Sequence, residues 1–187
     1  MPVVTPAQEQ CGAFLAQHFV VLRRPCPVLF SYHSADCFCH GLSYVPKPAD
    51  VEAARAILRD AKKREIPILT PADTNLGFDV GPKTVERFTS FLKDAGTIFW
   101  NGPLGWFEKP EYAKGTFEVA KFVAALPALK VVGGGDTVSA IKQSGFADRF
   151  DHLSTGGGAV LEYIEQGSLP GIDILKVYRQ AQSPYLA

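Results

Sequence analysis

The chain has 187 residues, of which 47% are hydrophobic and 20% charged, a composition typical of one globular domain and not of a disordered segment. Basic and acidic residues balance at 19 each, so no net charge attracts nucleic acid or an acidic membrane surface. No apolar run reaches the roughly 18 residues of a membrane span, and the chain does not start like a secretory leader. We therefore predict a soluble, cytoplasmic protein with no nucleic-acid or membrane partner.

The first 41 residues are predicted to form an irregular segment that we assign to no domain. Prolines interrupt any periodicity there, and we expect only a short helix over 6–22 and a strand over 27–32. All the cysteines lie in this segment: Cys11, Cys26, Cys37 and Cys39. With His33 and His40 nearby they suggest a metal site, but their spacing differs from the CxxC pattern of zinc sites. We favour incidental thiols.

From residue 42 to residue 187 we expect a second unit in which helices and strands alternate. Asp50 is a suitable N-cap, apolar residues then recur at helical spacing, and Lys62 and Lys63 suit a helix end. Strands are expected over 66–69, 97–100, 130–132 and 152–154; helices are expected over 84–95, 116–126, 137–143 and 159–166, with an irregular tail after Leu175. This alternation predicts an α/β fold, a three-layer Rossmann-like parallel sheet with helices on both faces.

Three of the expected strands end in loops rich in Gly, Asn or Asp, at 101–108, 133–137 and 155–158. Because ligands bind outside the carboxyl ends of strands in open parallel sheets, we expect these loops on a common rim. Glycines let the backbone approach a ligand, and the helix that follows each glycine run favours an anion at its N-terminus. One such run fits a simple tight turn better, but two after consecutive strands favour a phosphate cradle.

Polar residues in these loops suggest the chemistry of the site. A carboxylate at Asp136, beside bound phosphates, is a natural contact for Mg²⁺, although it also suits an N-cap. The Asn101 amide is able to donate to a phosphoryl oxygen, and the Glu108 carboxylate is able to accept from ribose hydroxyls. Trp106 and Phe107 fit a packing role better than ligand stacking. Neither GxxxxGK[ST] nor GxGxxG occurs, so the chain is neither an ordinary P-loop protein nor a typical dinucleotide binder.

The same loops resemble those of the phosphoglycerate kinase family. The segments TIFWNGPLGWFE from Thr97, VVGGGDTVSAI from Val131 and HLSTGGGAVLEYIEQGSLPGIDIL from His152 match it in order and approximate spacing. GFDVGPKTVE from Gly77 is similar to the segment before them, and the resemblance covers about residues 42–175. It implies the nucleotide-binding C-terminal domain of a glycolytic kinase that, with Mg²⁺, transfers a phosphoryl group between 1,3-bisphosphoglycerate and ADP.

The resemblance also implies roles for individual residues. Backbone N–H groups of Gly156, Gly157 and Gly158 are expected to hold the phosphoryl group during transfer, the catalytic role in a reaction that depends on positioning and charge stabilisation. The residues implied to bind ADP or ATP are Gly77 and Phe78 at the adenine, Asn101 and Pro103 along the nucleotide, Glu108 at the ribose, and Gly134, Gly135, Asp136 and Thr137 at the phosphates and Mg²⁺.

Parts of the family pattern have no counterpart in the sequence. These are the N-terminal domain with its basic triose site and a lysine-bearing GAK segment, and residues 69–78 are shorter than the family's equivalent. We therefore expect a fold that is incomplete relative to the family. Besides an active kinase, the alternatives are a non-catalytic ADP- or ATP-binding module, an inactive truncated fragment, and a subunit that works with a separate chain carrying the triose site.

Overall fold

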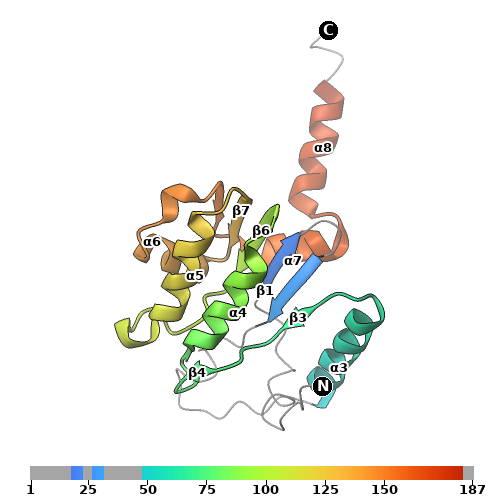
Figure 1. Cartoon of the computed structure of the whole chain (residues 1–187). Helices are drawn as coiled ribbons and strands as arrows, with labels where there is room; N and C mark the ends of the chain where they lie inside the picture. Colours follow the sequence, from blue (N-terminus) through green and yellow to red (C-terminus); the bar gives the residue numbers. More distant parts are fainter. Residues whose placement is uncertain (1–17, 23–26, 32–47, 183–187) are drawn as a thin grey trace.

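The computed structural model describes residues 18–22, 27–31 and 48–182, which build a six-stranded sheet with helices packed against it (Figure 1). In sheet order the strands are β3 (Ile68–Leu69), β2 (Pro27–Ser31), β1 (His18–Leu22), β6 (Thr97–Asn101), β7 (Leu129–Gly133) and β8 (His152–Ser154). A small separate sheet pairs β4 (Thr74–Asn75) with β5 (Asp79–Val80). β6, β7 and β8 run parallel to one another.

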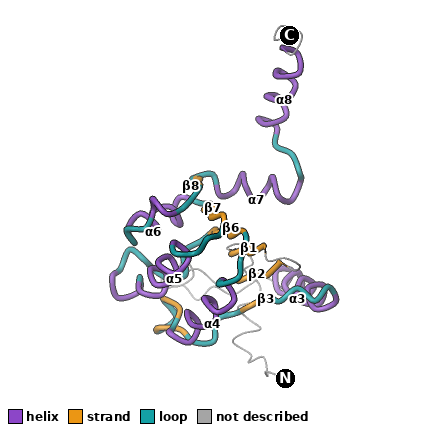
Figure 2. Tube along the Cα trace, turned by 45° about the horizontal axis from the view of Figure 1, so that its top comes forward, coloured by secondary structure: helices purple, strands orange, loops and turns teal. Residues whose placement is uncertain are grey.

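Helices and strands alternate along the chain, as the sequence predicted. α4 (Pro82–Leu92), α5 (Lys114–Ala124) and α6 (Gly135–Gln143) lie next to one another against the sheet, and α3 (Pro48–Lys63) lies beside its β3 end (Figure 2). α7 (Gly157–Gln166) follows β8, and α8 (Pro170–Gln182) projects away from the body of the molecule (Figure 1). A parallel sheet flanked by helices confirms the α/β, Rossmann-like fold class.

The core lies between the sheet and helices α4 and α5. Ile98 and Trp100 of β6 and Val132 of β7 are fully buried there, since alternate residues of a strand point to the same face. Each large apolar side chain buried in this way stabilises the fold by about 1.5–3 kcal/mol. On the other face of the same strands, Phe99 is half-buried and Leu129 is 51% exposed. The face that packs on α4 and α5 is therefore the better covered one.

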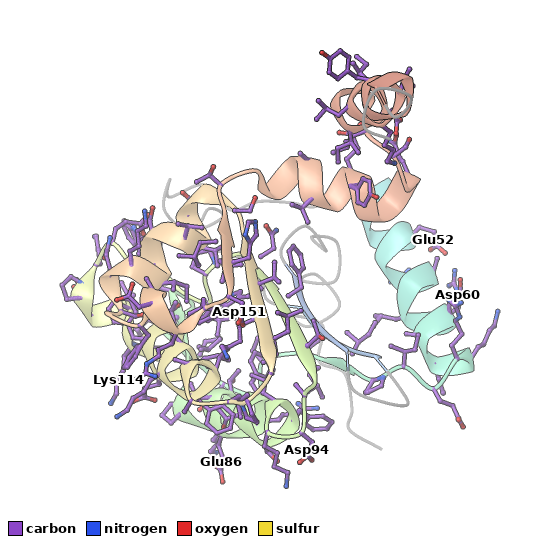
Figure 3. All side chains as sticks on the ribbon, turned by 90° about the horizontal axis from the view of Figure 1, so that it is seen from above. Glu52, Asp60, Glu86, Asp94, Lys114 and Asp151 are labelled. Carbon is purple, nitrogen blue, oxygen red and sulfur yellow. The ribbon has the colours of Figure 1, made fainter. Side chains whose placement is uncertain are left out.

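Charged side chains lie mainly on the outside of the helices. Glu52 and Asp60 point outward from α3 (Figure 3), and the Glu52–Arg59 ion pair is exposed, so it adds little stability. The charged group of the buried Lys130, in contrast, makes hydrogen bonds within the protein. Its Nζ donates to the carbonyls of Leu126 and Ala128 at 3.0 and 2.8 Å. This lysine lies near the amino end of β7, at the opposite end of the strand from the glycine run.

The N-terminal strands correct one prediction and agree with another. β1 is a strand at residues that were predicted to end a helix, whereas β2 coincides with the strand predicted over 27–32. β1 pairs antiparallel with both β2 and β6, whereas β2 with β3 and β6 with β7 and β8 are parallel, so the sheet as a whole is mixed. After His18 the strand is a continuous run of apolar, partly β-branched residues, Phe19 to Leu22, which suits a strand enclosed on both sides. The four cysteines lie outside the described residues.

The C-terminal part also differs from the prediction. α8 occupies residues that were expected to become an irregular tail after Leu175. Proline suits the first position of a helix because its fixed φ is helical and its missing N–H is not needed there, so Pro170 is able to begin α8. Within the described residues, no helix combines the length and apolar character needed to cross a bilayer.

Candidate functional site

The carboxyl ends of β6, β7 and β8 meet at one rim of the sheet. In the strand register Asn101 lies opposite Gly133, and Gly133 lies opposite Ser154. The N–H of Gly134 also donates to the carbonyl of Ser154 at 2.9 Å, which joins the loops after β7 and β8. The predicted common rim is therefore present, and it brings together the loops that start at residues 101, 133 and 155.

The glycines of the two runs have different surroundings. A Cβ on the buried Gly157 would lie 2.8 Å from Asn101 Oδ1 and 2.8 Å from the Cα of Gly134, closer than real Cβ atoms come. Gly134 has a φ of 93°, a conformation that favours glycine. Gly135 and Gly158, in contrast, have open space where a side chain would be, with no described atom within 4 Å. Each loop thus has one tightly packed glycine, Gly134 or Gly157. The glycine that follows it, Gly135 or Gly158, has open space beside it.

Asn101 lies at the centre of this arrangement. It is 8% exposed, and its Oδ1 is the atom nearest to the space beside both Gly134 and Gly157. Within the described part of the chain, no hydrogen bond involves its carboxamide. A buried polar group without a partner costs about 1–3 kcal/mol. Such a group in a native protein calls for an explanation, and a polar ligand is one.

Two helices begin at the rim. α6 starts at Gly135 and α7 at Gly157, and no side chain caps the first turn of either helix within the described residues. Uncapped first-turn N–H groups, together with the helix dipole, favour an anion. The N–H of Gly156 has a weak partner in Ser154 Oγ at 3.3 Å. The predicted phosphate-binding glycines 134, 135, 156, 157 and 158 are all found at this rim.

Asp136 is exposed in the first turn of α6. Among the described residues there is no group of three or more His, Cys, Asp or Glu side chains able to hold a metal ion. Mg²⁺ is commonly bound by one or two carboxylates together with substrate phosphates. A single carboxylate beside a phosphate cradle fits that mode, and it does not fit a metal site made of protein ligands alone.

The segment Gly102–Glu108, here called the rim loop, is fixed from several sides. Thr137 is buried, and its Oγ1 accepts the N–H of Gly102 at 2.6 Å. Thr116 Oγ1 accepts the N–H of Leu104 at 3.0 Å, a contact that sequence reasoning missed. The predicted phosphate contact Thr137 therefore also holds the rim loop, and its hydroxyl proton is left to donate elsewhere.

The predicted adenine side is built by the β4–β5 hairpin. Its turn has positive φ at both Leu76 (53°) and Gly77 (80°), and the N–H of Phe78 donates to the carbonyl of Asn75 at 3.0 Å. Positive φ at both central residues is the type I′ geometry that suits hairpins, and glycine adopts it most readily. The carbonyl of Phe78 then accepts the N–H of Trp106 at 2.8 Å, so the hairpin is joined to the rim loop.

The aromatic residues at this end pack on one another. Trp106 is parallel to Tyr112, with ring centroids 6.2 Å apart, and Lys109 Nζ lies 3.9 Å from the Trp106 ring centre. Both contacts agree with the packing role expected for Trp106, as does the burial of Phe107. Pro103 is buried within the rim loop, while Glu108 is exposed at its end. No hydrogen bond to the Glu108 carboxylate occurs among the described residues.

Two aspartates that sequence reasoning did not single out act as remote caps of helices. Asp73 accepts the N–H groups of Lys83 and Thr84 in the first turn of α4, at 3.1 and 2.7 Å. Asp79 is 1% exposed and accepts the N–H of Gly115, the second residue of α5, at 2.7 Å. Their partners are 10, 11 and 36 residues away, so no local pattern marks them.

The two carboxyl groups have pKa values shifted in opposite directions. Burial raises the pKa of Asp79 to about 6, and Glu118 adds to the rise, while hydrogen bonds from Gly115 and Val80 oppose it. For Asp73, burial acts to raise the pKa, but hydrogen bonds from Thr84 and Lys83 outweigh this effect. The pKa of Asp73 is therefore lower than its ordinary value.

Comparison with known proteins gives a consistent result. The sequence model of the family "Phosphoglycerate kinase" matches residues 38–167. The phosphoglycerate kinase of Bdellovibrio bacteriovorus is 48% identical over 129 residues, which cover 69% of this chain and 32% of that protein. The protein of the same name from Thermus thermophilus is 48% identical over 130 residues, covering 69% and 33%.

Solved structures agree. The phosphoglycerate kinase of Coxiella burnetii superposes with a TM-score of 0.63 at 33% identity, covering 70% of this chain and 40% of that one. For the phosphoglycerate kinase of Pyrococcus horikoshii the TM-score is 0.61 at 32% identity, with coverage of 70% and 37%. The chain spans about a third of the length of the curated relatives it matches.

Proposed function

Because the chain belongs to the phosphoglycerate kinase family, we propose that its rim binds ADP or ATP and holds the phosphoryl group that passes between 1,3-bisphosphoglycerate and the nucleotide. The observation that carries this proposal is the buried Asn101 carboxamide, which has no hydrogen-bond partner in the described residues and lies between two glycine loops. A phosphoryl oxygen would accept its N–H₂ group and remove the cost of leaving it unpaired.

The glycine loops supply the other donors. Gly135 and Gly158 have open space on their Cα side, so a phosphate is able to approach the backbone there. The N-termini of α6 and α7 add positive potential at the same place. In our proposal the N–H groups of Gly156, Gly157 and Gly158 stabilise the phosphoryl group in transfer, and Gly134, Gly135 and Thr137 hold the phosphates of the nucleotide.

The remaining parts of the nucleotide extend toward the hairpin. We propose that Gly77 and Phe78 border the adenine, that Pro103 forms part of the wall of the pocket, and that Glu108 accepts the ribose hydroxyls. The support is that the Phe78 carbonyl bonds to the rim loop, which places hairpin and loop together. The exposed Glu108 carboxylate is free of hydrogen bonds to the described residues, so it is available to a ligand.

Asp136 would hold Mg²⁺ together with the nucleotide. Its carboxylate is exposed one residue after Gly135, beside the space where the phosphates would lie. Bound Mg²⁺ supplies positive charge that offsets the negative charge of the phosphates. The protein's own part is to keep one carboxylate at the start of α6, where the first-turn N–H groups also face the phosphates.

The chain matches only part of its relatives, and this affects which parts of the reaction it can supply. Transfer to or from the triose needs a site that binds phosphoglycerate, and the chain spans about a third of the curated relatives. We propose that the triose site is supplied by residues outside the described rim, in the same or a separate polypeptide, and that the reaction is cytoplasmic. On its own, the described rim would act as an ADP- or ATP-binding module, the second candidate function.

Replacement of Asp136 tests this proposal. Asp136→Asn removes the charge that would hold Mg²⁺ and keeps the size of the side chain. We expect the affinity for Mg-ADP to fall by about tenfold, the effect of losing one interaction with a charged group, and the affinity for ADP in excess chelator to stay unchanged. Isothermal titration of both variants under both conditions measures this.

Asp148→Asn is the matched control, because Asp148 is also exposed and lies just before β8, at the end of the sheet away from the rim. It should bind Mg-ADP like the unchanged chain. Equal affinity for Mg-ADP in Asp136→Asn and in the unchanged chain would remove Asp136 from the site.

A further inference from the structure

A buried carboxylate outside the proposed ligand contacts joins the rim loop to the rest of the domain. Asp79 is in β5 and is 1% exposed. Its Oδ1 accepts the N–H of Val80 at 2.9 Å and its Oδ2 accepts the N–H of Gly115 at 2.7 Å. Both oxygens are therefore used, and one of them reaches the first turn of α5.

Two glycines make room for this carboxylate. A Cβ on Gly105, in the middle of the rim loop, would overlap Asp79 Oδ1 and lie 2.5 Å from the carbonyl oxygen of Tyr112. A Cβ on Gly115 would also come within 2.7 Å of Asp79 Oδ1. Three segments distant in sequence, namely β5, the rim loop and the start of α5, thus converge on one side chain.

The neighbours of Asp79 and Gly115 in the sequence hold the rim loop directly. Phe78, just before Asp79, accepts the N–H of Trp106 at 2.8 Å. Thr116, just after Gly115, accepts the N–H of Leu104 through its hydroxyl at 3.0 Å. A change in the position of β5 relative to α5 would therefore displace the rim loop at both hydrogen bonds.

We propose that Asp79 is a positioning residue of the nucleotide site: by tying β5 to the N-terminus of α5, its carboxylate fixes the rim loop and Phe78 in the arrangement that receives the nucleotide. This inference rests on the proposed function of the rim. Burial raises the pKa of Asp79 to about 6, so its charge is kept there against desolvation. The negative charge of Glu118 in α5 adds to this rise in pKa. Lys114 Nζ lies 3.9 Å from Glu118 Oε1.

The test compares Asp79→Ala and Asp79→Asn with Asp73→Ala in the full chain. Asp73 is the matched control because it also caps a helix from a distance, through Lys83 and Thr84 of α4, and its described contacts do not reach the rim loop. Amide hydrogen exchange reports the rim loop directly at Leu104 and Trp106. Isothermal titration with Mg-ADP reports the site.

We expect Asp79→Ala to speed exchange at the Leu104 and Trp106 amides and to weaken Mg-ADP binding by at least about tenfold, as for a lost bond to a charged group. Asp79→Asn keeps the shape and one acceptor, so both effects should be intermediate. Asp73→Ala should speed exchange at Lys83 and Thr84 and leave the rim loop and the affinity as they are.

Rim-loop exchange and affinity that stay unchanged in both Asp79 variants would overturn the proposal. An equal loss of affinity in Asp73→Ala would overturn it too, because the effect would then reflect general loss of stability. If Asp79→Ala does not fold, the same exchange and affinity measurements on Asp79→Asn and the unchanged chain decide whether the proposal holds. An unchanged chain that binds no Mg-ADP would contradict the nucleotide function, whereas the exchange data would still decide whether Asp79 fixes the loop.

Discussion

Gly157 is a glycine because Asn101 Oδ1 and the Gly134 backbone occupy the space that a Cβ would need. Gly134 is a glycine because of its φ of 93°, and a Cβ there would also lie only 3.0 Å from Asn101 Oδ1. Gly135 and Gly158 have no such neighbour among the described residues, and in our proposal they leave room for the phosphates. The sequence shows two glycine runs without this difference, because it arises from contacts between three strands that are far apart in the chain.

Gly157→Ala should therefore disturb the rim. The added methyl group would meet Asn101 Oδ1 and the Gly134 backbone, and we expect the loops after β7 and β8 to move apart. Overpacking of this kind lowers the free energy of unfolding by about 1–3 kcal/mol. Thermal melting and Mg-ADP titration should both show a loss.

Gly171→Ala serves as the matched control for that substitution. Gly171 lies in α8 and has no described atom within 4 Å of its Cβ position. Alanine should be neutral or slightly stabilising there, because it is the better helix former. A Gly157→Ala variant that melts and binds like the Gly171→Ala variant would show that the contact with Asn101 does not constrain the rim.

Asp79 also predicts how stability depends on pH. Because burial raises its pKa to about 6, the folded chain binds the proton more tightly than the unfolded chain, whose carboxyl titrates near 4. The stabilisation due to this proton is complete below about pH 4 and is lost as the pH rises through about 6. Asp79→Asn does not titrate, so the Tm of the unchanged chain relative to this variant should fall between about pH 4 and pH 7. A constant difference over that range would contradict the raised pKa.

At the scale of elements, the β1–β2 hairpin has an unusual position. Its residues precede the part of the chain that matches the family, residues 38–167, yet it lies between β6 and β3 in the sheet. β1 pairs with β2 on one side and β6 on the other. Without it β6 would be an apolar edge strand, a feature that promotes association between chains.

Val20→Pro tests the hairpin. Val20 is opposite Leu29 of β2 and Phe99 of β6, and proline at an enclosed strand position removes a donor from the ladder. We expect the free energy of unfolding to fall by about 1–3 kcal/mol or more, from the unpaired backbone carbonyl alone. Val20→Ile keeps the N–H and the β-branched shape and should melt like the unchanged chain. Equal melting of the proline and isoleucine variants would mean that β1 is dispensable.

The elements that could be predicted are those with regular apolar spacing or with residues that clearly mark where the element ends. The strand predicted over 97–100 is a short apolar run followed by Asn-Gly-Pro, and the helix after it shows regular apolar spacing; the structure has both elements, with the strand extended to Asn101. The run at His18–Leu22 has no period, and its neighbours suggested a helix. The remote caps Asp73 and Asp79 could not be predicted, since their partners meet them only in the folded chain.

At the scale of the whole molecule, the candidate nucleotide site is made within one sheet and its loops. The rim was predictable because parallel strands put their carboxyl ends together, and two glycine runs marked that edge. The hydroxyl contacts of Thr116 and Thr137 that fix the rim loop were not predictable. They place the loop before any ligand binds, which is why we expect the rim to bind nucleotide without a triose site.

Exposed apolar side chains lie elsewhere on the molecule. Ile174 and Tyr178 of the projecting α8 are 69% and 61% exposed, and Leu129 is exposed on the less covered face of the sheet. None of these residues lies in the rim or in the rim loop. The candidate nucleotide site and these apolar surfaces are therefore separate features of the chain.

Isothermal titration of the full chain with Mg-ADP is the most direct measurement of nucleotide binding at the rim, once thermal melting has shown a cooperative transition. We predict a saturable heat with a Kd between the micromolar and the low-millimolar range. A chain that melts cooperatively but gives no heat over that range would contradict nucleotide binding at the rim and leave the family's fold without the family's ligand.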